Sequence, residues 1–112
     1  MIVVFVDDLL FRSKIRAVAS HTGAAVSFVR DPADPSIAGA TLAILNLDDA
    51  GAIAAIGTLT SAWPALRVIG FVSHVNADRI REARAAGPVE VMARSAFVNA
   101  LPSLLADETH AG

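Results

Sequence analysis

The stretch Ile2-Val3-Val4-Phe5-Val6-Asp7-Asp8 decides the fold. Its first five residues are apolar without polar alternation, which is typical of a strand covered on both faces, as in a parallel sheet between two layers of helices. Two carboxylates follow directly at the carboxyl end of this strand, where open α/β sheets place their ligand sites. The stretch therefore predicts a buried parallel strand that leads into a functional edge of the sheet.

The rest of the chain alternates apolar runs with segments of helical periodicity. The further strands are expected at residues 24–29, 41–45, 67–72 and 89–93, and the helices at 9–21, 50–62, 77–86 and 96–106. This alternation predicts a three-layer, doubly wound α/β domain with five parallel strands and right-handed crossovers. We expect one domain over residues 1–106, followed by a flexible C-terminal tail over 107–112.

Prolines interrupt the pattern at two places. Pro32 and Pro35 lie between the second and third strands and oppose a regular helix there, except for a single first turn opened by Pro35 and capped by Asp34. The second crossover helix is therefore expected to be shortened or missing. Pro102 is expected to bend the last helix or to start a second piece.

Composition limits the classes of function. Hydrophobic residues make up 54% of the chain and charged residues 18%, which argues against disorder. No apolar stretch approaches the ~18 residues of a membrane span, and the start lacks a basic leader. A net charge of −2 gives no footprint for nucleic acid, and the absence of cysteine excludes disulfides and thiolate metal sites. We expect a cytoplasmic domain that binds neither membrane nor nucleic acid.

Polar side chains gather where the predicted strands end. Asp7 and Asp8 could hold Mg²⁺ together with Asp48, because hard cations prefer carboxylate oxygens. A hydroxyl and a cation could hold an anion at the same edge. The polar strand-end residues are Asp7, Asp8, Asn46, Asp48, Ser73, Arg94 and Ser95. Asp8 has a second interpretation, as the N-cap of the helix that follows it.

These residues resemble the receiver domains of bacterial response regulators. The resemblance is carried by Val6-Asp7-Asp8, the strand at 43–47, Phe71-Val72-Ser73 and the run from Ala86-Gly87 to Arg94, and it covers nearly the whole chain. It implies a flavodoxin-like sheet in the order 2-1-3-4-5. It also implies an acid pair that binds Mg²⁺ with a phospho-accepting aspartate, and a switch formed by a Ser or Thr and a Lys.

The chain departs from that family pattern at the positions that carry the chemistry. Asn46 stands at the phosphoacceptor position, and an amide cannot form an acyl phosphate. Arg94 stands at the lysine position, although an alternative alignment puts Ser95 there. Val91 replaces the aromatic residue usual in the last strand. Ser73 matches the switch hydroxyl.

The sequence therefore predicts a stand-alone pseudo-receiver without enzymatic activity, which signals through a protein partner and could form a homodimer. The expected contact surface is the face formed by the helix at 77–86, the fifth strand and the last helix, or that of the first helix. The residues proposed for the former face are Arg79, Arg81, Arg84 and Val91. No cofactor is required, although Asp7, Asp8 and Asp48 could bind Mg²⁺ weakly. Two alternatives are phosphorylation at Asp48 or Asp49 and binding of a small anionic ligand.

Overall fold

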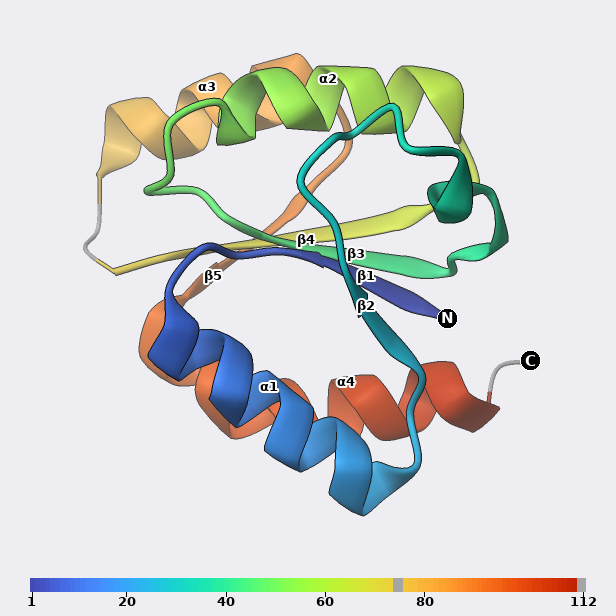
Figure 1. Ribbon diagram of the computed structural model, residues 1–112. Helices are drawn as coiled ribbons and strands as arrows, with labels where there is room; N and C mark the ends of the chain where they lie inside the picture. Colours follow the sequence, from blue (N-terminus) through green and yellow to red (C-terminus); the bar gives the residue numbers. More distant parts are fainter. Residues whose placement is uncertain (74–75, 111–112) are drawn as a thin grey trace.

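The computed structural model describes residues 1–73 and 76–110, with side chains as far as residue 106. The predicted three-layer fold is confirmed: a five-stranded parallel sheet in the order β2-β1-β3-β4-β5 lies between two layers of helices (Figure 1). The strands are β1 (Ile2–Phe5), β2 (Val26–Phe28), β3 (Leu42–Asn46), β4 (Arg67–Val72) and β5 (Glu90–Ala93). The helices are α1 (Leu9–Thr22), α2 (Ala52–Ala62), α3 (Ala77–Ala86) and α4 (Arg94–His110). No helix in the described part of the chain is long and apolar enough to span a bilayer.

Two apolar layers hold the helices to the sheet. On one face α1 and α4 cover β1, β3 and β4, and three rings stack there, with 4.7 Å between the centroids of Phe11 and Phe71 and 4.8 Å between those of Phe71 and Phe97. On the other face α2 and α3 cover the same strands through residues such as Leu45 and Ile56. Because both faces of β1 and β3 are covered, their residues need no polar alternation.

The crossover between β2 and β3 contains no α-helix. Its only regular element is a 3₁₀ turn, η1 (Pro35–Gly39), in which the Asp34 carboxylate accepts a hydrogen bond of 2.9 Å from the Ser36 N–H. This confirms the prediction that the second crossover helix is reduced to a turn opened by Pro35. Only Ile37 of this turn is buried, so the α2 side of the sheet beside β2 has a thinner cover than the rest.

The last helix differs from the prediction. It begins directly after β5, at Arg94 rather than at residue 96, and it continues through Pro102 as a single helix. Of the two outcomes expected at Pro102, a bend or a second piece, the second piece does not form. The residues on both sides pack against the same face of the sheet: Phe97 and Leu101 before Pro102, and Leu105 after it. A bend stays a prediction. The helix includes residues 107–110. The expected flexible tail stays a prediction, because side chains from 107 onward and the whole of 111–112 lie outside the described residues.

Candidate functional site

The two acids that follow β1 have different surroundings. Asp8 is the N-cap of α1, and its carboxylate accepts a hydrogen bond of 3.1 Å from the Phe11 N–H. The capping interpretation of Asp8 is therefore confirmed. Asp7 is exposed and lines a cavity at the carboxyl end of the sheet. Of the pair, Asp7 is the residue that faces a space where a ligand could bind.

Asn46, at the end of β3, is tied into the loop that follows it. Its side-chain oxygen accepts a hydrogen bond of 3.0 Å from the Asp48 N–H, and its side-chain nitrogen lies 3.5 Å from the Asp49 Oδ1 to which it donates. Both ends of the amide are therefore used within the loop. Asn46 is half-buried, and its place at the strand end is the one that the sequence predicts.

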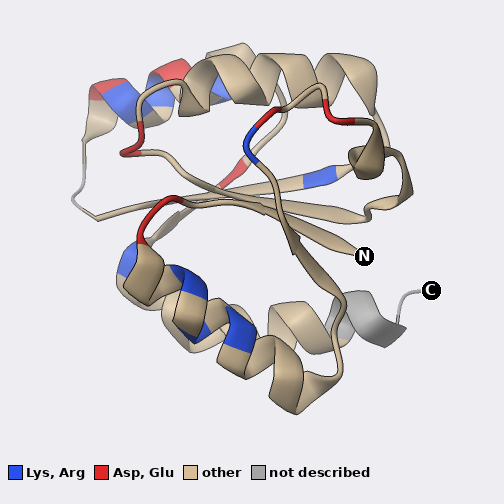
Figure 2. Ribbon diagram, in the orientation of Figure 1, with Lys and Arg blue, Asp and Glu red and all other residues tan. Residues whose placement is uncertain are grey.

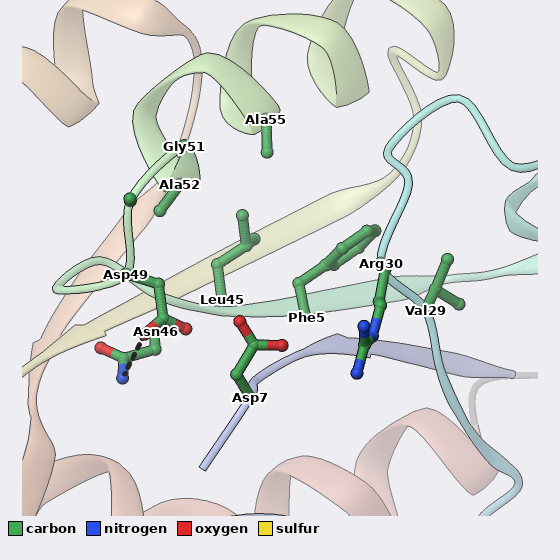
Figure 3. Close-up of a pocket in the computed structure, with 11 residues that line it drawn as sticks. Phe5, Asp7, Val29, Arg30, Leu45, Asn46, Asp49, Gly51, Ala52 and Ala55 are labelled. Atoms are coloured by element: carbon green, nitrogen blue, oxygen red, sulfur yellow. Dashed lines mark hydrogen bonds between the residues drawn. The ribbon is translucent and has the colours of Figure 1, made fainter.

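The next two acids diverge. The Asp48 carboxylate accepts a hydrogen bond of 2.9 Å from the Ser73 N–H and so joins the loop to the end of β4. Asp49 lines the cavity with Asp7 and Asn46, as Figure 3 shows. The sequence named Asp48 as the third metal-binding acid, but Asp49 is the acid that lies beside Asp7. Alternation along an extended strand cannot reveal this, because the chain turns immediately after Leu47.

Asp49 occupies an electrostatically unfavourable position. Desolvation raises the pKa of its carboxyl above the usual value of 3.8, and the negative charges of Asp7, Asp48 and Asp8 raise it further, while the Asp7 N–H lowers it. A cation bound between Asp7 and Asp49 would relieve this repulsion. In the described part of the chain, however, no three acidic or histidine side chains come close enough together to hold a metal ion.

The expected magnesium ligands therefore do not converge as a set. Asp8 caps α1, and Asp48 accepts from the Ser73 N–H. Of these three acids, only Asp7 has a carboxylate that accepts no such hydrogen bond from the described residues. The residues present fit a hard cation poorly, because Mg²⁺ prefers a near-octahedral oxygen shell. Binding of Mg²⁺ by Asp7, Asp8 and Asp48 stays a prediction.

The loop after β3 is held by a residue that the sequence placed elsewhere. Arg79 was predicted on the solvated outer face of α3, but its side chain is half-buried and turns toward this loop. Its Nε donates to the Leu47 C=O at 2.7 Å, and its Nη2 donates to the Asp49 C=O at 3.0 Å. The planar guanidinium presents several N–H donors at once and satisfies both carbonyls, which explains why the side chain lies against the loop and not in solvent.

The cavity itself is lined by both apolar and charged side chains. Its volume is about 180 Å³. Its apolar lining residues include Phe5, Val29, Leu45, Ala52 and Ala55, and its charged and polar ones are Asp7, Arg30, Asn46 and Asp49 (Figure 3). Ala50 and Gly51 complete the lining. Sequence reasoning missed Arg30. It follows the second strand as Asp7 follows the first, so the rule that located the other polar residues applies to Arg30 too.

The two predicted switch positions lie in a separate groove. Ser73 and Arg94 line it together with Ser95, the alternative choice for the lysine position. Arg94 is the first residue of α4, and its guanidinium carbon lies 4.8 Å from the centroid of the Phe11 ring. The structure thus brings Ser73 and Arg94 together in one groove. Neither residue lines the cavity that contains Asp7 and Asn46.

Of the residues proposed for a partner surface, Arg81 and Arg84 are exposed on α3. Arg81 pairs with Asp78 one turn earlier on the same helix. Val91 is half-buried in the edge strand β5 and packs on the apolar layer under α2 and α3. Arg79 is half-buried, and its guanidinium donates to the loop after β3. Its part in a partner surface stays a prediction.

No protein-family model matches the sequence, and no curated protein matches it. Solved structures do match. A response regulator from Hahella chejuensis has a TM-score of 0.75 at 19% identity, over 95% of this chain and 92% of that one. A response regulator from Burkholderia pseudomallei, with a phosphorylated aspartic acid, a calcium ion and citrate, has a TM-score of 0.71 at 20% identity, over 98% of this chain and 70% of that one. A receiver domain protein from Methanospirillum hungatei has a TM-score of 0.73 at 12% identity, over 99% and 97%.

These neighbours define the class of fold. The strand order, the parallel pairing and the extent of the match together give this chain the fold of response-regulator receiver domains, as the sequence resemblance predicts. At such low identity the likeness carries the fold alone.

Proposed function

We propose that this domain acts in signal transduction as a pseudo-receiver, by binding a protein partner without being phosphorylated. The observation that carries the proposal is Asn46 at the end of β3, where the receiver pattern has its phospho-accepting aspartate. A side-chain amide does not attack phosphorus as a carboxylate does, so Asn46 cannot form an acyl phosphate. Both ends of the Asn46 amide are also hydrogen-bonded within the loop.

Phosphorylation of Asp49 is the second candidate function. The observation that favours it is the position of Asp49, whose carboxylate lines the same cavity as Asp7. Asp48 is a weaker candidate than Asp49, because its carboxylate accepts from the Ser73 N–H and does not line the cavity. A solved receiver neighbour contains a phosphorylated aspartic acid, so the chemistry is known for this fold.

Intact-mass measurement separates the two functions. The protein is incubated with a small phosphodonor and Mg²⁺ and weighed, beside Asp49→Ala, Asp48→Ala and a denatured control. Our proposal predicts no added phosphoryl group on the folded protein. An added phosphoryl mass that disappears in Asp49→Ala and persists in Asp48→Ala would establish the second candidate and overturn the proposal.

The face of α1 is the contact surface that the side chains support best. Leu9 is 74% exposed and Leu10 85% exposed, and they are the most exposed large apolar residues in the described part of the chain. Figure 2 shows Lys and Arg along the same helix, which contains no acid. An exposed apolar pair at the start of a basic helix is complementary to a partner surface that has an apolar patch surrounded by acidic residues.

The alternative surface of α3, β5 and α4 is less basic than the sequence suggested. Arg79 is withdrawn to the loop after β3, and Arg81 is paired with Asp78. Binding of a partner captured by the native protein should therefore be lost in Leu9→Ser/Leu10→Ser and kept in Arg81→Ser/Arg84→Ser. The reverse pattern would place the contact on α3. Loss of self-association in the same Leu9 and Leu10 variant would identify the partner as a second copy of the chain.

A further inference from the structure

A second cavity lies between the start of α1 and the end of β2. It adjoins the cavity beside Asn46 and shares Asp7, Val29 and Arg30 with it. Its volume is about 220 Å³. It is lined by Val6, Asp7, Arg12, Phe28, Val29 and Arg30. Two of these residues are arginines that come from different elements, Arg12 from α1 and Arg30 from the residue after Val29. Neither has a part in the proposed function.

The two arginines lack anionic partners in the protein. In residues 1–73 and 76–106, no hydrogen bond or ion pair involves the guanidinium of Arg12 or that of Arg30. The Nε of Arg12 is also buried with no acceptor. A buried donor left without an acceptor is costly, which indicates that an acceptor from outside the chain would be favourable here.

Packing holds Arg12 in place. Its guanidinium carbon lies 4.6 Å from the centroid of the Phe28 ring, and that of Arg16 lies 4.6 Å from the same centroid. Stacking on a ring fixes the plane of a guanidinium and leaves its N–H edge available for hydrogen bonds. The site is therefore partly pre-organised before any ligand binds.

The charge around the cavity is positive. Asp7 is the one acid among the lining residues, and it makes no ion pair within the described chain with either arginine. Its charge acts on Asp49, in the neighbouring cavity, where it raises the pKa of that carboxyl. Figure 3 shows the Asp7 carboxylate between Asp49 on one side and Arg30 on the other. Asp7 and Arg30 line both cavities, whereas Asp49 lines only the first and Arg12 only the second. The second cavity therefore has two arginines and one acid in its lining.

We infer that Arg12 and Arg30 form a binding site for a phosphate group, carried by a small molecule that enters this cavity. A phosphate dianion neutralises both guanidiniums, and its tetrahedral oxygens can accept from two N–H forks at once. A carboxylate carries one charge and two oxygens, so it satisfies one fork and leaves the other unpaired.

Titration with inorganic phosphate tests this site. We expect saturable chemical-shift changes at the backbone amides of Val6, Phe28 and Val29, at constant ionic strength with chloride as the competing anion. Arg12→Gln and Arg30→Gln should each weaken binding by about tenfold or more, since each removes charged hydrogen bonds. Arg84→Gln makes the same charge change on α3, far from the cavity lining, and should bind as the native protein does.

Arg30 is exposed, so Arg30→Gln should fold even if Arg12→Gln does not, and a thermal melt of each variant checks this. Arg12→Lys keeps the charge but loses the fork and should also bind more weakly. Three results would each overturn the proposal. These are chemical-shift changes that do not saturate with phosphate, equal phosphate affinity of Arg30→Gln and Arg84→Gln, and acetate binding as tight as that of phosphate.

Discussion

At the scale of single residues, Asp49 is the acid whose ionisation opposes folding. Burial and the charge of Asp7 raise its pKa in the folded chain above the usual value of 3.8. The folded state therefore holds the Asp49 proton more tightly than the unfolded state does. Stability is lost as the pH rises from about 3.8 through the raised pKa, and it stays lower at neutral pH.

Asp49→Asn should accordingly stabilise the protein at pH 7, by less than about 1 kcal/mol because the site is partly exposed. The gain should shrink on acidification and vanish below the usual pKa, where the native carboxyl is protonated in both states. Urea unfolding at several pH values measures it. Asp48→Asn is the control, since it removes the same charge from a side chain that accepts from Ser73. An equal, pH-dependent gain in both variants would assign the effect to net charge.

Arg79 is the residue that fixes the conformation of the loop after β3. Arg79→Ala removes its two hydrogen bonds to the Leu47 and Asp49 carbonyls and should cost about 1–2 kcal/mol. Denaturant unfolding followed by the fluorescence of Trp63 gives the value. Arg84→Ala, on the same helix but exposed, should change stability by no more than about 0.5 kcal/mol. Similar small stability losses in Arg79→Ala and Arg84→Ala would show that the loop keeps its conformation without the Arg79 hydrogen bonds.

At the scale of elements, the sequence predicts the strands, the helices and the 3₁₀ turn well, because each depends on local patterns. Apolar runs without alternation mark strands covered on both faces, and Asp34-Pro35 marks the start of a single turn. The bounds of α4 are the exception. Its start at Arg94 depends on β5 passing directly into a helix, and no cap residue signals that start.

The directions of the site residues are less predictable. Periodicity places Arg79 correctly on α3, but it cannot predict that the side chain donates hydrogen bonds to the Leu47 and Asp49 carbonyls. Likewise, whether Asp48 or Asp49 faces Asp7 depends on the turn after Leu47. The Leu47 side chain packs tightly on Gly70: a Cβ added to Gly70 would lie 2.7 Å from the Leu47 Cγ. Such contacts join residues far apart in the sequence, so a local pattern cannot reveal them.

Pro102 gives a prediction about α4 as an element. A proline in the interior of a helix removes one hydrogen bond and crowds the preceding turn, at a cost of about 3 kcal/mol relative to Ala. Pro102 is exposed, so Pro102→Ala changes little else and should stabilise the protein. The gain should be below that figure, since Ala also frees the unfolded chain. Thermal unfolding measures the change. Destabilisation would mean that the helix does not continue through this position.

At the scale of the whole molecule, the sheet couples the two apolar layers. β1, β3 and β4 contribute alternate residues to both faces, so Val3 and Val4, adjacent in the chain, belong to opposite layers. Loss of one layer would expose the covered face of every central strand. This arrangement favours a single cooperative unfolding transition, as is usual for a domain of this size.

Phe97→Leu tests that coupling. Phe97 is fully buried between α4 and the sheet and stacks on Phe71, whereas Trp63 packs against the apolar layer on the opposite face. The substitution removes the ring contact and should cost about 1–3 kcal/mol. If the domain is cooperative, the fluorescence of Trp63 and the far-ultraviolet circular dichroism should move to lower denaturant together and keep coincident midpoints. A shift in circular dichroism that leaves the Trp63 transition in place would show that the layer under α2 and α3 persists without the other.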